Sequence, residues 1–298
     1  MDTQKCQYCG SKEVIKRGMR STQNRGKIQR YSCKDCKKRF VVKDAFYRMR
    51  NSQKKITCAI DLFFRGVSTR KIQEHFRMFY PHNCNNATIY RWIIRYSEQI
   101  SSFTDTLKVN TGAEIQVDEV EFHRRKSHKA SLGVAKNWLI DSIDVKTRYA
   151  VAVDFVEHRS KENIKSVMKN IKRKSDNVEV ITTDGFMAYT KVVKKTFGYD
   201  KHTKSYKVKH NQVNASQGEG FNYPVERMHN NIRARTKVMR GFHGSVYSAR
   251  TILKGMFVYY NFITKHQGIN CTPASLATDI KLENPNKWLE LINLSTLA

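Results

Sequence analysis

The order of hydrophobic and polar positions divides the chain into three regions and a tail. Residues 1–45 are mostly polar and rich in lysine and arginine, whereas residues 46–104 repeat apolar positions at helical spacing. Alternating strand patterns begin near residue 105 and then mix with helical patterns. We therefore expect domains at 1–45, 46–104 and 105–278, followed by a C-terminal helical tail at 279–298.

Three helical periods follow one another in the second region. Ser68 is placed to cap the second helix, and either Asn86 or Thr88 can cap the third. Arg91 and Arg95 lie one turn apart on the outer face of the third helix. The positions expected to face inward are Ile56, Ala59, Ile60, Phe63, Ile72, Phe76, Ile89, Trp92, Ile93 and Tyr96. The pattern predicts a helix-turn-helix arrangement.

The third region begins with strands. Residues 114–122 alternate apolar and polar positions, and two further strand patterns at 138–144 and 149–155 flank a short turn. A helix is expected over about 160–174, and residues 178–184 then form a strand that runs parallel to the first, because a helix joins them. The pattern predicts an α+β fold with a mixed sheet flanked by helices.

The charge of the chain points to a polyanionic partner. Its 298 residues include 55 Lys and Arg against 26 Asp and Glu, a formal net charge of +29. Such an excess is typical of nucleic-acid-binding proteins. An anionic membrane surface is not favoured, because the sequence has neither a long apolar stretch nor a basic amphipathic helix with aromatic anchors. The polar N-terminus lacks the pattern of a signal peptide, so we expect a cytoplasmic protein.

The basic third helix of the second region is therefore a candidate for the element that enters a DNA major groove. Arg91 and Arg95 are its candidate DNA-binding residues. The alternative is a helical linker or a dimerisation bundle whose basic face is merely solvated.

Four of the seven cysteines form two close pairs, Cys6 with Cys9 and Cys33 with Cys36. Two pairs with this spacing can bind one Zn²⁺ ion tetrahedrally and leave no open coordination position. A segment of this size has too small a core to fold unaided, which favours one structural zinc ion in a DNA-facing zinc ribbon. The alternative is four free cysteines in a basic tail.

Three acidic residues are candidates for a second metal site. Asp118 lies in the first strand of the third region, Asp184 ends the parallel strand, and Glu226 falls in the first turn of a helix that opens with a proline. Carboxylates shared between two divalent cations can support phosphoryl-transfer chemistry. Each acid also has a simpler interpretation, since an Asp-Gly pair is common in turns, a Glu in a first turn supports the helix, and each acid could pair with a nearby Lys or Arg.

The stretches around these acids resemble the DDE transposases of bacterial and archaeal insertion sequences, which have a ribonuclease H-like integrase fold. The matching segments are VDEVEF, VITTDGFMAY, VERMHNNIRARTKVMRGFHG and YYNFITKHQGINCTPASLA, which together span about residues 110–278. The insertion sequence six family and its archaeal relatives form the most similar group.

The resemblance implies that Asp118, Asp184 and Glu226 are the catalytic triad and bind two Mg²⁺ or Mn²⁺ ions. It also implies that Arg233, two helical turns after Glu226, lies against DNA. The rival for the third acid, Glu219, sits among glycines, a poor position for a rigid ligand. Further basic residues that we expect to neutralise DNA phosphates are Arg227, Arg235, Lys237 and Arg240.

Other polar residues in the third region are given smaller roles. Glu121 is expected to be a supporting or surface acid, and Asp141 and Asp144 are not expected among the metal ligands. His229 could orient DNA or a carboxylate, or could be a plain surface residue of a basic helix.

The function implied is a DNA transposase that binds the terminal inverted repeats of its element, cleaves a strand and transfers it into target DNA. Its partner is double-stranded DNA, and a homodimer or larger assembly is expected because two ends must be joined. We expect it at the nucleoid, in the cytoplasm of a prokaryote. The alternatives are a zinc-ribbon and helix-turn-helix regulator with an inactive nuclease core, and a nuclease of the same fold that cuts without joining.

Overall fold

The structure is a computed structural model and describes residues 4–22, 26–80, 84–125, 133–213, 223–239 and 241–297. The strands are β1 (Val14–Thr22), β2 (Gly26–Cys33), β3 (Arg39–Val41), β4 (Glu114–Arg125), β5 (Val134–Asp144), β6 (Ala150–Val156), β7 (Val180–Thr183), β8 (Tyr199–Asp200), β9 (Ser205–Tyr206), β10 (Lys209–Gln212) and β11 (Phe242–His243). The helices are α1 (Gln53–Phe64), α2 (Thr69–Phe79), α3 (Asn86–Thr106), α4 (Lys161–Lys174), α5 (Ala188–Phe197), α6 (Tyr223–Val238), α7 (Val246–Val258), the π-helix η3 (Tyr259–Ile263), α8 (Pro273–Ala277) and α9 (Lys287–Leu297). Among these described helices, none combines the length and the apolar character needed to cross a membrane.

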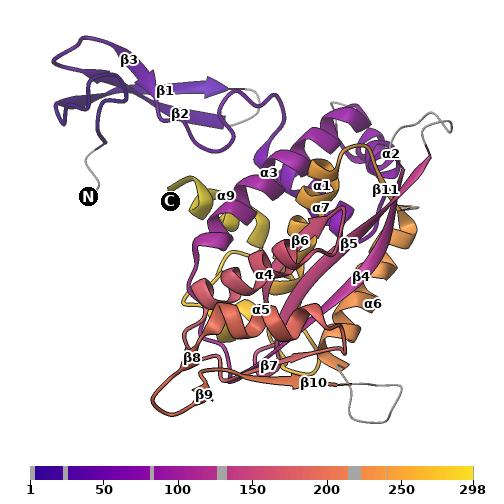
Figure 1. The fold of residues 1–298 in the computed structure, drawn as a ribbon. Helices are drawn as coiled ribbons and strands as arrows, with labels where there is room; N and C mark the ends of the chain where they lie inside the picture. The colour runs from indigo at the N-terminus through magenta and orange to yellow at the C-terminus, as the bar shows by residue number, and fades with distance from the viewer. Residues whose placement is uncertain are drawn as a thin grey trace.

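The N-terminal strands form a small antiparallel sheet of their own, which we call the ribbon. Its strand order is β1-β2-β3, and it projects from the rest of the molecule (Figure 1). A separate hydrophobic cluster supports it, made of Cys6, Cys33 and Phe40, with Val14 and Tyr31 packed against them. Strands β1 and β2 occupy the segment between the two cysteine pairs, and β3 follows the second pair.

Helices α1, α2 and α3 follow the predicted pattern with one correction. Ser68 caps α2 as expected, because its side chain accepts a hydrogen bond from the backbone N–H of Lys71. The cap of α3 is Asn85 and neither Asn86 nor Thr88, since Asn85 has an extended backbone and its side chain accepts from the N–H of Ala87. The ten positions predicted to face inward are all buried.

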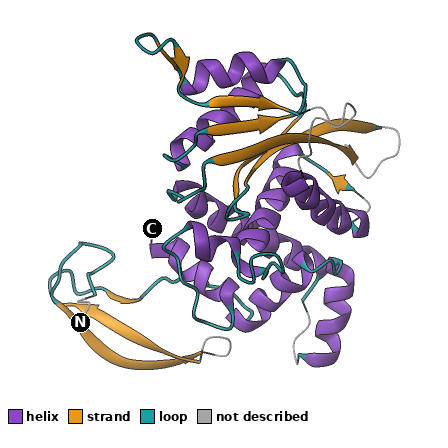
Figure 2. Cartoon of the chain, turned by 90° about the horizontal axis from the view of Figure 1, so that it is seen from below, coloured by secondary structure: helices purple, strands orange, loops and turns teal. Residues whose placement is uncertain are grey.

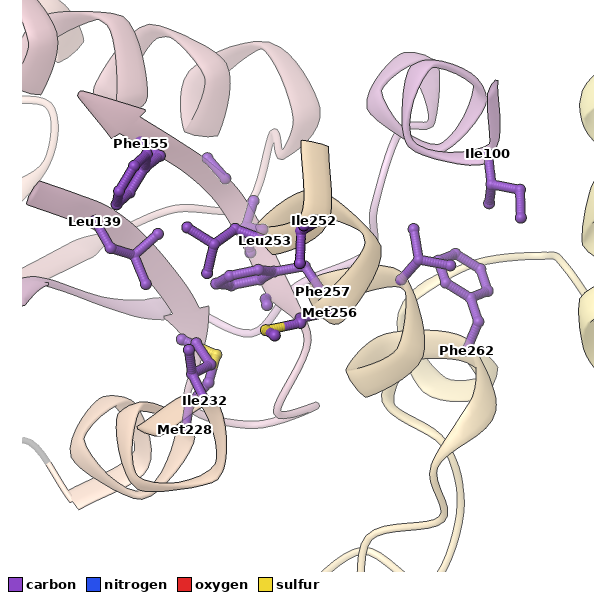
Figure 3. Packing of buried hydrophobic residues seen from close by; sticks show 14 of the residues in the cluster. Ile100, Leu139, Phe155, Met228, Ile232, Ile252, Leu253, Met256, Phe257 and Phe262 are labelled. Atoms are coloured by element: carbon purple, nitrogen blue, oxygen red, sulfur yellow. The ribbon is translucent and has the colours of Figure 1, made fainter. Parts of the chain in front are cut away.

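One hydrophobic cluster joins the helical region to the main sheet. It runs from Phe46 and the first helices through the sheet strands to α7 and α9. Figure 3 shows Ile100 of α3 and Phe257 of α7 within this continuous packing. The domain boundaries at 45, 104 and 278 stay predictions, and the structure adds that a single cluster runs across the last two.

The main sheet has the order β10-β7-β4-β5-β6, and β11 also pairs with β4. Strands β4, β5 and β6 form an antiparallel meander, whereas β7 and β10 run parallel to β4. Helices α4 and α5 cover one face, and α6 and α7 cover the other (Figures 1 and 2). The predicted fold class is confirmed: this is a mixed, ribonuclease H-like sheet with flanking helices.

Candidate active site and candidate zinc site

Asp118 and Asp184 lie side by side where β7 ends. In the parallel pairing of β4 with β7, Gln116 stands opposite Thr182. Two residues further along each chain, the two acids are therefore neighbours on the same face of the sheet. Oxygen atoms of Asp118, Glu119 and Asp184 all lie within 4.8 Å of one another. The structure thus brings together two of the three predicted acids and adds Glu119.

Asp184 also has the turn role that its Asp-Gly sequence predicts. Its Oδ1 accepts a hydrogen bond of 3.0 Å from the backbone N–H of Phe186, which shapes the chain between β7 and α5. A carboxylate has four lone-pair positions on two oxygens, so the turn and a metal ion can share this side chain.

Glu119 is held by partners from the other side of the sheet. The hydroxyl of Tyr189 donates to Glu119 Oε2, and Arg159 Nη1 lies 3.1 Å from Glu119 Oε1. The Arg159 guanidinium lies 4.5 Å from the ring centre of Trp138 and 4.4 Å from that of Phe186. Burial raises the pKa of Glu119, although Tyr189 and Arg159 both act to lower it. This acid is thus fixed in position before any ion binds.

Asp118 has a histidine and a second aspartate as neighbours on its own face. His229 on α6 places Nδ1 3.7 Å from Asp118 Oδ2 and Nε2 2.8 Å from Asp141 Oδ1. Burial raises the pKa of Asp118 to about 7, although His229 acts to lower it. Burial alone would lower the pKa of His229, but the charge and hydrogen bond of Asp141 outweigh it and leave that pKa above its ordinary value. A divalent cation would favour the charged form of Asp118 in the same way.

Glu226 stands apart from the carboxylate group. It is exposed in the first turn of α6 and is not among the described residues whose ligand atoms gather within 4.8 Å. His229 lies one turn later on the same helix and contacts Asp118. Helix α6 therefore runs past the carboxylate group. Glu226 lies one helical turn before His229, the residue that contacts Asp118. Glu219 lies outside the described residues.

Other polar residues of the third region have structural partners. Asp144 accepts hydrogen bonds from the backbone N–H groups of Gly112 and Thr147 and from the Thr147 hydroxyl. Glu121 forms surface contacts of 3.5 Å with His123 and Lys136. Neither acid is among the described residues whose ligand atoms gather within 4.8 Å of Asp118.

The basic residues predicted to bind DNA are mostly free to do so. Arg91 and Arg95 are exposed on α3, and the exposed positions on α6 include Arg227, Arg233 and Lys237. Arg235 is instead half-buried, and its Nη1 donates a 2.7 Å hydrogen bond to the carbonyl of Arg65. It therefore ties α6 to the end of α1. Arg240 lies outside the described residues.

The four paired cysteines meet at one end of the ribbon. The Sγ atoms of Cys6 and Cys36 are 3.6 Å apart, as are those of Cys9 and Cys33. These separations fit a tetrahedral zinc ion, in which Zn–S bonds of about 2.3 Å give sulfur separations of about 3.8 Å. All four are free thiols with Sγ atoms within 4.8 Å of one another. This group could hold a zinc ion with no position left for a substrate.

A family model of the DDE domain of transposases matches residues 133–267. This segment is a DDE transposase domain. The match includes Asp184 and Glu226, and it begins just after the strand that carries Asp118. The sheet, with its antiparallel meander and two parallel strands, has the arrangement that the sequence resemblance implied. No curated protein sequence matches the chain significantly.

Solved structures of integrases and transposases show a distant similarity to this chain. A simian T-cell lymphotropic virus intasome, solved with the PP2A regulatory subunit B56 gamma, aligns at 10% identity with a TM-score of 0.40 over 76% of each chain. The HTLV-2 integrase catalytic core domain, solved with magnesium, aligns at 16% identity and a TM-score of 0.36 over 56% of this chain and 97% of its own. The Drosophila P element transposase strand transfer complex aligns at 15% identity and a TM-score of 0.34 over 57% and 42%.

Proposed function

We propose that this protein is a DNA transposase that cleaves the ends of its own element and joins them to target DNA. The observation that carries the proposal is the pairing of Asp118 with Asp184 at the end of β7, in a chain whose residues 133–267 match a DDE domain. In a chain with a net charge of +29, neighbouring carboxylates are best explained by cations that bind between them.

The residues proposed to hold two Mg²⁺ or Mn²⁺ ions are Asp118, Asp184 and Glu226. Carboxylate oxygens are the preferred ligands of these ions. Ions held by these residues would supply activation of the attacking oxygen and neutralisation of charge on the phosphate. Glu226 lies on the exposed first turn of α6, and it completes the site when that turn approaches the carboxylate pair.

The protein's own part in the reaction is to hold DNA in line with this group. Arg227, Arg233 and Lys237 are exposed on the helix that carries Glu226, where they can neutralise phosphates. Water first cleaves the strand and leaves a 3′-hydroxyl on the element. That hydroxyl then attacks a target phosphate, forms the new phosphodiester bond and displaces the 3′ oxygen of the target strand.

Recognition of the terminal inverted repeats is proposed for the ribbon and the helical region. The ribbon, with one zinc ion at its four cysteines, and α3, with exposed Arg91 and Arg95, are the candidate DNA contacts. Two element ends must be held together before joining, so we propose a homodimer or larger assembly on DNA. We place this activity at the nucleoid of a prokaryotic cell.

The test is a strand-transfer assay with labelled DNA ends from the flanks of the gene. Wild type, Asp184→Asn and the control Asp176→Asn are compared with Mg²⁺ or Mn²⁺; Asp176 is a surface residue paired with Lys108. We expect joined product from wild type and the control, and a loss of at least about a hundredfold in Asp184→Asn, with end binding retained. Cleavage without joining would favour the nuclease alternative, and end binding without cleavage the regulator.

A further inference from the structure

Three side chains form a continuous bridge between α6 and the sheet, which we call the Asp141–His229–Asp118 bridge. Asp118 in β4 and Asp141 in β5 are direct cross-strand partners, so their side chains lie on the same face of the sheet. The imidazole of His229 lies between them, 2.8 Å from Asp141 and 3.7 Å from Asp118. Each ring nitrogen thus faces a different carboxylate.

The buried end of the bridge has a cost in stability. Asp141 has no exposed surface, and its Oδ2 has no hydrogen-bond partner among the described residues. A buried carboxylate oxygen without a partner destabilises a fold. Such a residue is retained most readily where it serves a function. The bridge is therefore better explained by what it positions than by the stability that it contributes.

The bridge borders the carboxylate group without belonging to it. Neither Asp141 nor His229 is among the described residues whose ligand atoms gather around Asp118. His229 touches the face of Asp118 covered by α6, whereas Tyr189 and Arg159 hold Glu119 from the other face. The partners of Asp118 and the partners of Glu119 thus hold these two neighbouring acids from opposite sides of the sheet.

The bridge also fixes the helix that carries the third predicted acid. Met228 and Ile232 of α6 pack against the sheet and α7 (Figure 3), but such apolar contacts have no preferred direction. The hydrogen bond from His229 to Asp141 is directional, so it sets how α6 is rotated over β5. Glu226, three residues earlier, is placed by that same rotation.

We propose that Asp141 and His229 are positioning residues for the metal site, which orient the Asp118 carboxylate and the first turn of α6 so that Glu226 can join the Asp118–Asp184 pair. This inference rests on the proposed function. Outer-shell partners of metal ligands act in this way, and their loss typically lowers metal affinity about 10- to 100-fold.

The experiment measures Mn²⁺ binding to the zinc-loaded full chain by titration calorimetry, together with thermal stability. The variants are Asp141→Asn, His229→Gln and His229→Asn. A glutamine amide reaches the place of Nε2 and keeps the bond to Asp141, whereas an asparagine amide reaches the place of Nδ1 and keeps the contact with Asp118. The matched control is His123→Gln, an exposed histidine on β4 that faces the surface acid Glu121, and Asp118→Asn marks the loss of the site.

We expect Mn²⁺ affinity to fall 10- to 100-fold in Asp141→Asn and in His229→Gln and to remain unchanged in His123→Gln. The melting temperature of Asp141→Asn should stay level or rise, because the variant removes a buried charge whose Oδ2 atom has no hydrogen-bond partner among the described residues. Unchanged Mn²⁺ affinity in the His229 variants, or an affinity that falls only together with the melting temperature, would show a merely structural bridge and overturn the proposal. If wild type binds Mn²⁺ no better than Asp118→Asn does, the proposed function is wrong. This inference, which depends on it, is then wrong as well.

Discussion

The ribbon and the helical region both precede the main sheet and both present basic residues, yet they are built on different principles. The ribbon has a cluster of its own that includes only Cys6, Cys33 and Phe40 as buried members. The helical region has no separate core, because Phe64 and Ile100 belong to the cluster that continues through the sheet. Each region therefore depends on a different partner for its stability.

This difference indicates how two candidate DNA-binding regions can be attached to one candidate active site. A ribbon whose hydrophobic cluster has only three buried members is expected to need a zinc ion as its core, and losing that ion should leave the rest folded. The helices use the sheet as their core, so they should lose structure only when the sheet does. Variants that unfold the ribbon alone, or the helices together with the sheet, test this comparison.

The largest effect is expected from Cys33→Ser, which removes a proposed zinc ligand from the ribbon cluster. Zinc binding contributes about 10–16 kcal/mol to folding in comparable small modules, so the ribbon should unfold. Limited proteolysis should then cut within residues 4–41 while the rest stays resistant, and end binding should fall. Cys271→Ser serves as the control, because Cys271 lies far from the zinc group in the sequence and is not part of it. Loss of the whole fold in Cys33→Ser would contradict the independence of the ribbon.

A smaller but global effect is expected from Asp105→Asn. Asp105 at the end of α3 lies 3.0 Å from Lys174 and 2.7 Å from Lys254, which belong to α4 and α7. Lys174 is only 6% exposed, so removing its partner should destabilise the chain by about 3 kcal/mol, the low end for a buried pair because Asp105 is partly exposed. Urea unfolding followed by tryptophan fluorescence should show one shifted transition. A transition confined to the helices would contradict the claim that the helical region and the sheet unfold together.

The same contact has a defined pH dependence. Burial raises the pKa of Asp105, but Lys174 and Lys254 outweigh it and hold that pKa below its usual value. Its contribution to stability is therefore complete above the unfolded pKa of about 3.9 and is lost as the pH falls below that value. The stability difference between wild type and Asp105→Asn should therefore shrink as the pH falls below about 4.

Gly255→Ala tests the packing between the two regions by steric means. An added Cβ would lie 2.4 Å from Phe64 and 2.5 Å from the hydroxyl of Ser97, so α7 and the helical region would have to move apart. We expect a loss of about 2 kcal/mol, as for other overpacked cores. Gly268→Ala, where nothing lies within 4 Å, should leave the melting temperature unchanged. Equal stability of the two variants would refute close packing here.

The smallest effect concerns α3 as a DNA contact. Arg91→Ala and Arg95→Ala each remove one exposed positive charge. If each side chain neutralises one phosphate, each variant should lower the slope of log K against log salt by about one, without loss of fold. Fluorescence anisotropy on an end-sequence duplex at several salt concentrations measures this slope. The control is the exposed Lys281→Ala, and an unchanged slope in both arginine variants would favour the solvated-bundle alternative.

Local patterns predicted much of this structure. The cysteine pairs could be identified from the sequence because each pair sits within one short turn. Asp118 and Asp184 could be matched because a helical crossover makes β7 parallel to β4, and this pairing aligns the two acids. Caps were less certain, since Asn85 and Asn86 offer the same chemistry one residue apart and only the backbone conformation selects Asn85.

The outer contacts of the site could not be predicted, because they join residues far apart in the sequence. Tyr189 reaches Glu119 across 70 residues, and His229 reaches Asp141 across 88. The sequence left His229 open between an orienting and a surface role, since a basic helix gives no sign of which side chain is buried. For Glu119, the one signal in the sequence is its position directly after Asp118 in the first strand.

The last helix, α9, has a consequence for how the protein is made. Trp288 donates to Asp61 and stacks on Phe64 of α1, and Asn286 donates to Thr57, across separations of 227 and 229 residues. During synthesis at about 5–20 residues per second, α1 therefore waits at least about ten seconds for these contacts. The ribbon needs only residues within its own first 41 and a zinc ion, so it can form while the ribosome is still translating the sheet. A nascent chain would then carry a finished ribbon while its helices still await their final neighbours.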